Sequence, residues 1–215
     1  MKKIVIANWK MNPQKLNDAK NLFNEIKRGE RMIKAIKDVE VIICPPFVFL
    51  ASLKANGSQD CFWQEGGAYT GEISPIMLKN LGVKYVILGH SERRRELKET
   101  NQMISKKVKA VMAVGLKPIL CIDKVSQIPK NIENLIIAYE PLFAIGTGRA
   151  CSWERAKKMK DKIQKALGKK VKILYGGSVN SQNAESYIKK AGFDGLLIGG
   201  ASLNPKEFIK IIKNL

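Results

Sequence analysis

The sequence contains only one histidine and four cysteines among its 215 residues. The cysteines, Cys44, Cys61, Cys121 and Cys151, are widely spaced and form no Cys-x-x-Cys pair. A metal site built from histidine and cysteine is therefore not expected. Because no export signal is recognisable, the cysteines are predicted to be free thiols.

The sequence also lacks a long apolar run. No stretch approaches the roughly 18–20 apolar residues that a membrane-spanning helix needs. The basic start, residues 1–3, is followed by the short apolar run 4–7, which is too brief for the core of a secretory signal. These absences predict a cytoplasmic protein that does not bind membranes.

Acidic residues are scarce beside basic ones, with 19 Asp and Glu against 38 Lys and Arg and a net charge of +19. Lysines at helical spacing, as in 157–165, are typical of a solvated helix face, but a basic surface can also attract nucleic acid or a phosphorylated metabolite. The basic residues are scattered, and no aromatic-rich RNA-binding signature accompanies them. This favours the solvated surface, and no nucleic-acid partner is predicted.

What the chain does contain is a regular alternation of short apolar runs and longer amphipathic stretches. Continuous apolar runs are typical of parallel strands that are covered on both faces. The expected strands are 4–7, 39–44, 85–88, 118–122, 135–139, 171–174 and 195–198, with a poorly patterned one around 58–62. The expected helices are 14–27, 75–81, 96–113, 153–167, 181–190 and 205–214.

Eight such units without a linker predict a single (βα)8 barrel domain over residues 1–215. These barrels usually need about 250 residues, so this chain should be a compact example. Residues 123–134 are interrupted by Pro129 and show no helical stripe, so the fifth barrel helix is expected to be missing. The tight stretch 49–62 predicts a shortened second helix and third strand.

Polar residues gather at the C-terminal ends of the expected strands. Asn8 and Lys10 follow the first strand, His90 the fourth and Glu140 the sixth. Taken singly, each has an ordinary explanation as a surface charge, a structural hydrogen-bonding group or a helix cap. Because barrel closure brings these strand ends to one mouth, their shared position predicts a catalytic site.

Two glycine pairs occupy the same end of the expected barrel. Gly176-Gly177-Ser178 follows the seventh strand, and Gly199-Gly200 follows the eighth. Glycine lets backbone N–H groups approach an anion closely, and the helix that follows adds its positive end. Barrels of this type often bind phosphate with these two loops, so a phosphorylated substrate is predicted.

Six motifs resemble those of the triosephosphate isomerase family, in the family's order. They are NWKMN (8–12), GAYTGEIS (67–74), GHSERR (89–94), AYEPLFAIGTG (138–148), YGGSVN (175–180) and DGLLIGGASL (194–203). The resemblance runs from Ile4 to the C-terminus. It implies a TIM barrel that interconverts the triose phosphates dihydroxyacetone phosphate and D-glyceraldehyde 3-phosphate, in glycolysis and gluconeogenesis, without cofactor or metal.

The resemblance also implies a role for each catalytic residue. Glu140 is the expected base, and His90 the neutral imidazole that polarises the carbonyl. Lys10 would supply positive charge near the enediolate, Asn8 would orient the substrate, and Glu92 would hold Lys10 in place.

A lid and a subunit contact are implied in the same way. The lid would consist of Pro141, Leu142, Phe143, Ala144, Ile145, Gly146, Thr147 and Gly148, with a second hinge at Arg149-Ala150-Cys151 and with Tyr175 bracing the closed form. The substrate phosphate would bind to Gly146, Ser178, Gly199 and Gly200. Thr70 would reach a neighbouring subunit, which predicts a homodimer.

Three departures from the family pattern stand out. Phe143 replaces a usual tryptophan, Asp60 a usual asparagine, and Asp123-Lys124 a usual Gly-Glu. None of them removes a catalytic group. Two other hypotheses remain open: a different phosphate-binding barrel enzyme, and a basic non-catalytic protein that binds nucleic acid.

Overall fold

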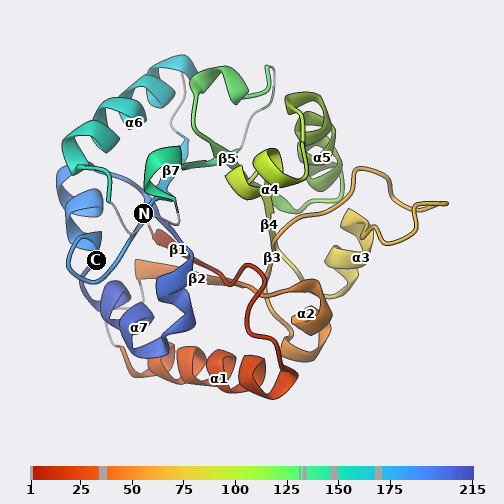
Figure 1. Cartoon of the computed structure of the whole chain (residues 1–215), viewed down its shortest axis with the longest axis horizontal. Helices are drawn as coiled ribbons and strands as arrows, with labels where there is room; N and C mark the ends of the chain where they lie inside the picture. The colour runs from red at the N-terminus through yellow and green to blue at the C-terminus, as the bar shows by residue number, and fades with distance from the viewer. Residues whose placement is uncertain (1, 34–37, 131, 133–134, 146–149, 168–170) are drawn as a thin grey trace.

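The computed structural model describes residues 2–33, 38–130, 132, 135–145, 150–167 and 171–215. Its eight strands form one sheet in the order β2-β1-β8-β7-β6-β5-β4-β3, and the sheet curls into a barrel surrounded by helices (Figure 1). The strands are β1 (Lys3–Asn8), β2 (Val39–Cys44), β3 (Gly57–Ser58), β4 (Tyr85–Leu88), β5 (Lys117–Ile122), β6 (Ile136–Tyr139), β7 (Lys172–Tyr175) and β8 (Gly195–Ile198). Every ladder is parallel, so the predicted barrel is confirmed.

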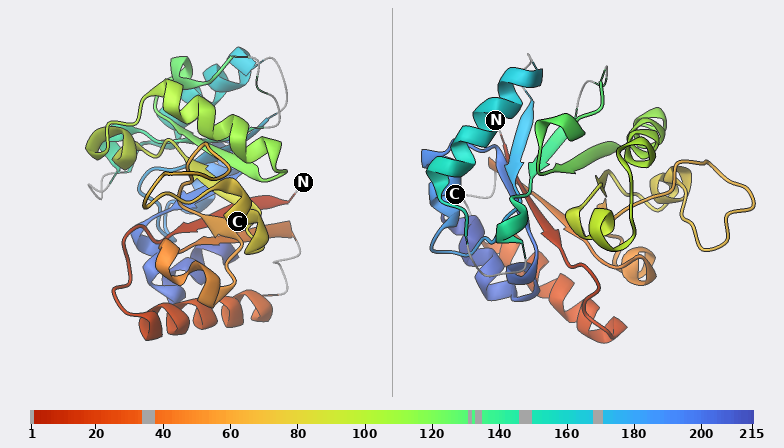
Figure 2. Two further views of the ribbon diagram at one scale, coloured as in Figure 1. Left: turned by 90° about the vertical axis from the view of Figure 1, so that its right-hand side faces the viewer. Right: turned by 45° about the horizontal axis from the view of Figure 1, so that its top comes forward.

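The helices lie outside the strands in all three ribbon views (Figure 2). The α-helices are α1 (Leu16–Met32), α2 (Phe47–Leu53), α3 (Pro75–Asn80), α4 (Ser91–Glu96), α5 (Asn101–Ala113), α6 (Trp153–Leu167) and α7 (Pro205–Lys213). Shorter 3-10 turns are η2 (Val125–Gln127), η3 (Leu142–Ala144) and η5 (Gly200–Leu203), and η4 (Ser186–Lys190) is a π-helix. Within the described ranges, none of the helices is both long and apolar enough to cross a membrane.

Three expected helices differ from those observed. The helix expected over 96–113 is wrong: α4 ends at Glu96, Lys98 adopts a left-handed φ of 56°, and the Thr100 side chain caps a new helix, α5. The first helix begins at residue 16 and continues to residue 32, beyond the expected end at residue 27. The segment 181–190 starts as a turn and ends in η4.

The core has two layers because side chains alternate along each strand. Ile4 and Ile6 of β1 point into the barrel, where they meet apolar side chains from the other strands. Val5 and Ala7 belong instead to the layer between the strands and the surrounding helices.

Between β5 and β6, the described residues form only η2, and the side chains of Ile128 and Ile132 pack against this outer layer.

Side-chain amides close the barrel between β2 and β3, and that of Asn56 makes two of the contacts. The Asn56 carboxamide accepts a hydrogen bond from the Ile43 N–H and donates one to the Val41 carbonyl, both at 3.0 Å. The next residue, Gly57, lies so close to β2 that an added Cβ would be 2.4 Å from the Cys44 sulfur. Side-chain amides therefore take the place of a backbone ladder across this seam.

A buried ionic cluster lies beneath the loop that follows β3. The Lys107 ammonium is 2.7 Å from Asp60 and 2.5 Å from Glu99, and the Arg93 guanidinium contacts both carboxylates. Burial raises the pKa of Asp60 to about 6, although Lys107 acts in the opposite direction. At Glu99 burial also opposes the charge, but hydrogen bonds from Lys107 and Arg93 outweigh it and lower the pKa.

The seam can be tested with Asn56→Ala. The change leaves the Ile43 N–H and the Val41 carbonyl without partners, so the free energy of unfolding should fall by about 2–3 kcal/mol in urea titrations. Asn80→Ala, at an exposed position at the end of α3, is the control and should change it by less than about 0.5 kcal/mol. An equally small effect at Asn56 would contradict the assigned role.

Asp60→Asn tests the buried charge. The folded-state pKa of Asp60, about 6, exceeds the ordinary value of 3.8, so the folded state holds this proton more tightly. The stabilisation that the protonated Asp60 carboxyl gives to the folded state is fully present below about pH 4. It is lost as the pH rises through 6, and this loss is at most about 3 kcal/mol of the free energy of unfolding. Relative to wild type, Asp60→Asn should therefore gain stability between pH 4 and 8. Parallel pH profiles of unfolding midpoints would contradict this.

Candidate active site

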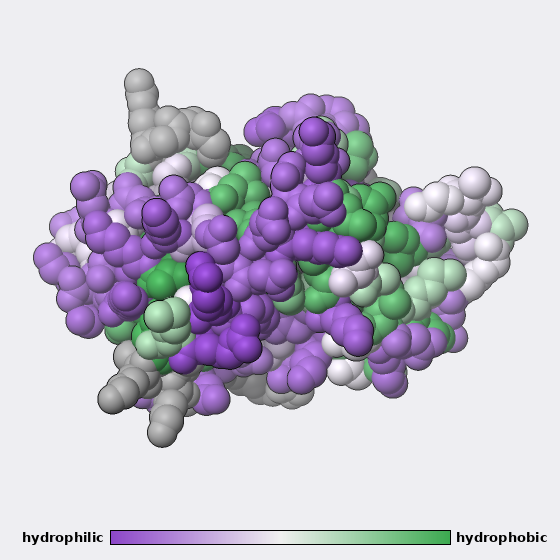
Figure 3. Space-filling view, turned by 90° about the horizontal axis from the view of Figure 1, so that it is seen from below, coloured by the Kyte–Doolittle hydropathy of each residue, from purple (hydrophilic) through white to green (hydrophobic). Residues whose placement is uncertain are grey.

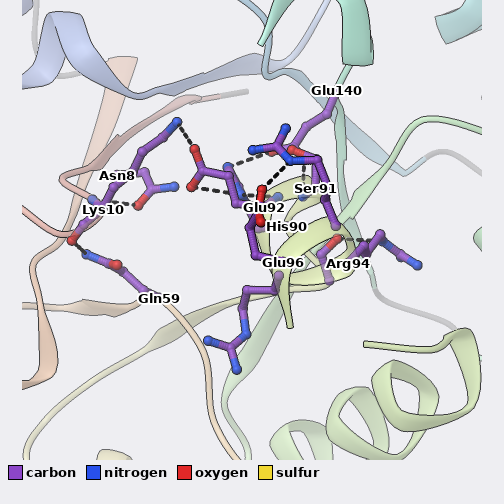
Figure 4. Close-up of polar contacts among 12 residues, drawn as sticks. Asn8, Lys10, Gln59, His90, Ser91, Glu92, Arg94, Glu96 and Glu140 are labelled. Atoms are coloured by element: carbon purple, nitrogen blue, oxygen red, sulfur yellow. Dashed lines mark hydrogen bonds and ion pairs between the residues drawn. The ribbon is translucent and has the colours of Figure 1, made fainter. Parts of the chain in front are cut away.

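The C-terminal strand ends surround a cavity of about 320 Å³. Asn8 and Lys10 reach it from β1, His90 from β4 and Glu140 from β6, and Figure 4 shows these side chains converging. The loops after β7 and β8 complete the lining with Gly176, Gly177, Ser178, Gly199 and Gly200. Residues predicted from distant segments therefore share one cavity.

Glu140 follows β6 directly, and its backbone N–H continues the sheet by donating to the Ile122 carbonyl at 2.8 Å. The side chain is almost fully buried, at 1% exposure. Its Oε2 accepts a hydrogen bond from the Ser91 N–H at 2.9 Å, at the N-terminus of α4. Oε1 lies 3.1 Å from Nε2 of His90 without a hydrogen bond (Figure 4). One carboxylate oxygen is thus anchored while the other faces the imidazole.

His90 is the N-cap of α4. Its Nδ1 accepts a hydrogen bond from the Glu92 N–H at 3.3 Å. A ring nitrogen that accepts a hydrogen bond carries no proton, so this contact favours the tautomer with its proton on Nε2. The helix N-terminus supplies this donor, and Nε2–H is left facing the cavity and Glu140.

Lys10 is held from several sides. Its Nζ lies 2.5 Å from Oε1 of Glu92, its N–H donates to the Asn8 side chain, and its carbonyl accepts from Gln59 (Figure 4). The backbone has a positive φ of 55°, which is strained for a lysine. These contacts keep an ammonium at the cavity wall beside Gly199, where an added Cβ would lie 3.2 Å from Cε of Lys10.

The glycine-rich side of the cavity carries the expected phosphate-binding residues. Gly200 begins η5 and has open space where a side chain would be. Ser178 donates its hydroxyl proton to the Ala144 carbonyl and so links this loop to η3. The described part of the expected lid is 141–145, in which Leu142 and Phe143 are exposed. Gly146, Thr147, Gly148 and Arg149 lie outside the described residues.

Two polar residues that line the cavity were missed by the sequence analysis. Asn180 and Asn183 line the cavity beside the Gly176–Ser178 loop. Asn183 donates to the Ser178 carbonyl at 3.2 Å, and the Asn180 side chain accepts from two backbone N–H groups just beyond it. The closely spaced asparagines after the glycine pair were the available signal, because asparagine commonly shapes tight turns in this way.

Comparison with known proteins agrees with this geometry. The family model for triosephosphate isomerase matches residues 3–215. Proteins named triosephosphate isomerase from Dictyoglomus thermophilum and Dictyoglomus turgidum are 39% and 38% identical over 251 aligned positions, which cover 99% of this chain and 99% of each relative. One from Dehalococcoides mccartyi is 39% identical over 249 positions, with 99% of this chain and 96% of the relative covered.

These alignments are longer than the 215-residue chain, so the relatives contain additional residues, as a trimmed barrel requires. The match extends over nearly the whole chain and includes every strand that contributes to the cavity. The chain therefore belongs to the triosephosphate isomerase family.

Proposed function

We propose that Glu140 is the base with which this protein carries out its family's reaction, the interconversion of dihydroxyacetone phosphate and D-glyceraldehyde 3-phosphate. Glu140 removes a proton from the carbon beside the carbonyl and returns it to the neighbouring carbon. The observation that carries the proposal is the convergence of Glu140, His90 and Lys10 on one cavity of about 320 Å³. The buried position of the carboxylate keeps competing water away from it.

The other polar groups stabilise the enediolate intermediate. The neutral His90 ring donates from Nε2 to the substrate oxygens and moves protons between them. Lys10 adds positive charge where negative charge develops, and Glu92 holds the ammonium by an ion pair. Asn8, buried at the end of β1, orients the substrate. This mechanism uses neither cofactor nor metal.

The glycine-rich loops bind the substrate phosphate. Backbone N–H groups of Gly199 and Gly200, at the start of η5, donate to the bound phosphate, and the Ser178 hydroxyl adds a donor once it is released from the Ala144 carbonyl. The lid, residues 141–148, contributes Gly146 and closes over the bound phosphate. Closure excludes water and protects the enediolate phosphate from losing its phosphate group.

The proposal extends to the whole chain, residues 1–215, as one barrel domain, since the single sheet takes strands from residue 3 to residue 198. The glycolytic substrates support a cytoplasmic location. Figure 3 shows a face covered largely by hydrophilic side chains. The scattered basic residues, with no aromatic-rich RNA-binding signature beside them, support the solvated-surface interpretation of the basic charge over binding of nucleic acid.

We also propose a homodimer, in which Thr70 of one copy reaches the active-site region of the other. The loop between β3 and α3, which carries Thr70, extends away from the barrel (Figure 1). A second cavity of about 570 Å³ adjoins the active site and is lined by Lys10, Met11 and Phe47. Met11 is 83% exposed, which is unusual for an apolar side chain beside a catalytic lysine.

The base is tested by shortening or neutralising Glu140. Glu140→Asp should lower kcat by about 100-fold or more, because the carboxylate retracts by one methylene from its reacting position. Glu140→Gln should abolish turnover in a coupled assay with purified protein. Glu25→Gln, at an exposed position on α1, should leave it unchanged. Wild-type turnover in Glu140→Gln would refute the assignment.

The dimer is tested by light scattering. Wild type should have twice the mass of one chain, and Thr70→Arg should shift it towards the monomer while lowering kcat, because the bulky charge cannot enter the neighbouring cavity. Asn24→Arg places the same side chain at an exposed position on α1 and should preserve the mass. A monomeric wild type with full activity would contradict the proposal.

A further inference from the structure

Two tyrosines hold the backbone of Cys151, the last residue of the second hinge of the proposed lid. Its N–H donates to the Tyr175 hydroxyl at 3.3 Å, and its carbonyl accepts from the Tyr187 hydroxyl. All three residues are buried. Both backbone groups of one residue are thus fixed by side chains from the β7 region and from η4.

The tyrosines also hold each other. Their rings stack with centroids 3.7 Å apart and an interplanar angle of 15°. Burial and then a hydrogen bond to Tyr187 raise the pKa of Tyr175, and burial likewise raises the pKa of Tyr187. Both hydroxyls therefore keep their protons. The two stacked tyrosines thus act together on Cys151: the Tyr175 hydroxyl accepts from its N–H, and the Tyr187 hydroxyl donates to its carbonyl.

The local backbone is adapted to this contact. Tyr187 lies in the π-helix η4, where the Ala191 N–H reaches back five residues to the Ser186 carbonyl at 3.0 Å. Short π-helical turns are rare in proteins overall, but those that occur are often found at functional sites. On the other side, Gly177 leaves room for the Tyr175 hydroxyl, since an added Cβ would lie 2.3 Å from it.

We propose that Tyr187 is a positioning residue for the isomerase reaction. It does not touch the substrate; it acts through Cys151 by fixing the C-terminal end of the segment that begins beside Glu140. The inference rests on the role proposed above for that segment. The two hydrogen bonds fix the backbone of Cys151 in advance, so the conformational entropy of this hinge residue is not lost when the proposed lid closes.

Loss of this anchor should have a chemical signature. With the segment poorly closed, the electron pair of the enediolate expels phosphate as its C–O bond breaks. The neutral enol that remains transfers its hydroxyl proton to the terminal carbon and becomes methylglyoxal. The products together contain the atoms of the triose phosphate, so no further reactant is needed. Released inorganic phosphate therefore reports closure separately from the isomerisation rate.

The test is Tyr187→Phe, which keeps the stacked ring and removes the hydroxyl. We expect kcat to fall about 5- to 10-fold, as for one lost hydrogen bond, and phosphate released per turnover to rise several-fold. Tyr85→Phe is the matched control, because it removes a hydroxyl that is hydrogen-bonded to Glu40 at the start of β2, far from the cavity. It should change neither quantity.

The outcomes separate the two proposals. Unchanged kcat and phosphate release in Tyr187→Phe, with turnover abolished in Glu140→Gln, overturn this inference and leave the proposed function intact. Retained turnover in Glu140→Gln overturns the proposed function itself. Phosphate released per turnover does not depend on how much of the enzyme is folded, so a partly unfolded preparation of Tyr187→Phe still gives a decisive ratio.

Discussion

The site depends on the closed parallel sheet, because its catalytic residues come from three segments that are far apart in sequence: 8–10, 90–92 and Glu140. β1 pairs with both β2 and β8, and this brings Lys10 beside the glycine pair after β8. The ladder from β4 through β5 to β6 brings Glu140 to the start of α4, where the Ser91 N–H holds it. Parallel strands place all these ends at one rim.

Charged and polar side chains adjoin one another across this rim. The Lys10 ammonium pairs with Glu92, the Glu92 N–H donates to His90, and His90 faces Glu140. Each group fixes the orientation of the next, and the neutral imidazole separates the two carboxylates. The short helix α4 carries the middle of this chain. A small rotation of α4 would therefore displace the base, the imidazole and the ammonium together.

Much of this arrangement could be predicted from the sequence, and the reasons for the misses are physical. The apolar runs predicted the positions of seven strands closely, because a strand that is buried on both faces is apolar at nearly every position. The break between α4 and α5 was missed because Lys98 is left-handed and Thr100 is a cap, features that periodicity does not report. Glu140 accepts a hydrogen bond from the Ser91 N–H, and the Tyr187 hydroxyl donates to the Cys151 carbonyl. Both contacts join segments that are far apart in the sequence, so a local residue pattern does not predict them.

The seam at Asn56 has a consequence for heat inactivation. A backbone ladder distributes its hydrogen bonds over several residues, whereas here the carboxamides of Asn56 and Gln59 join β2 to the neighbouring segment. Gln59 lies just beyond, and its amide holds the carbonyls of both Lys10 and Cys44. Warming that loosens the seam should therefore displace the Lys10 ammonium at a lower temperature than the Glu140 carboxylate. The enzyme should lose its electrostatic assistance while most of its secondary structure is still intact.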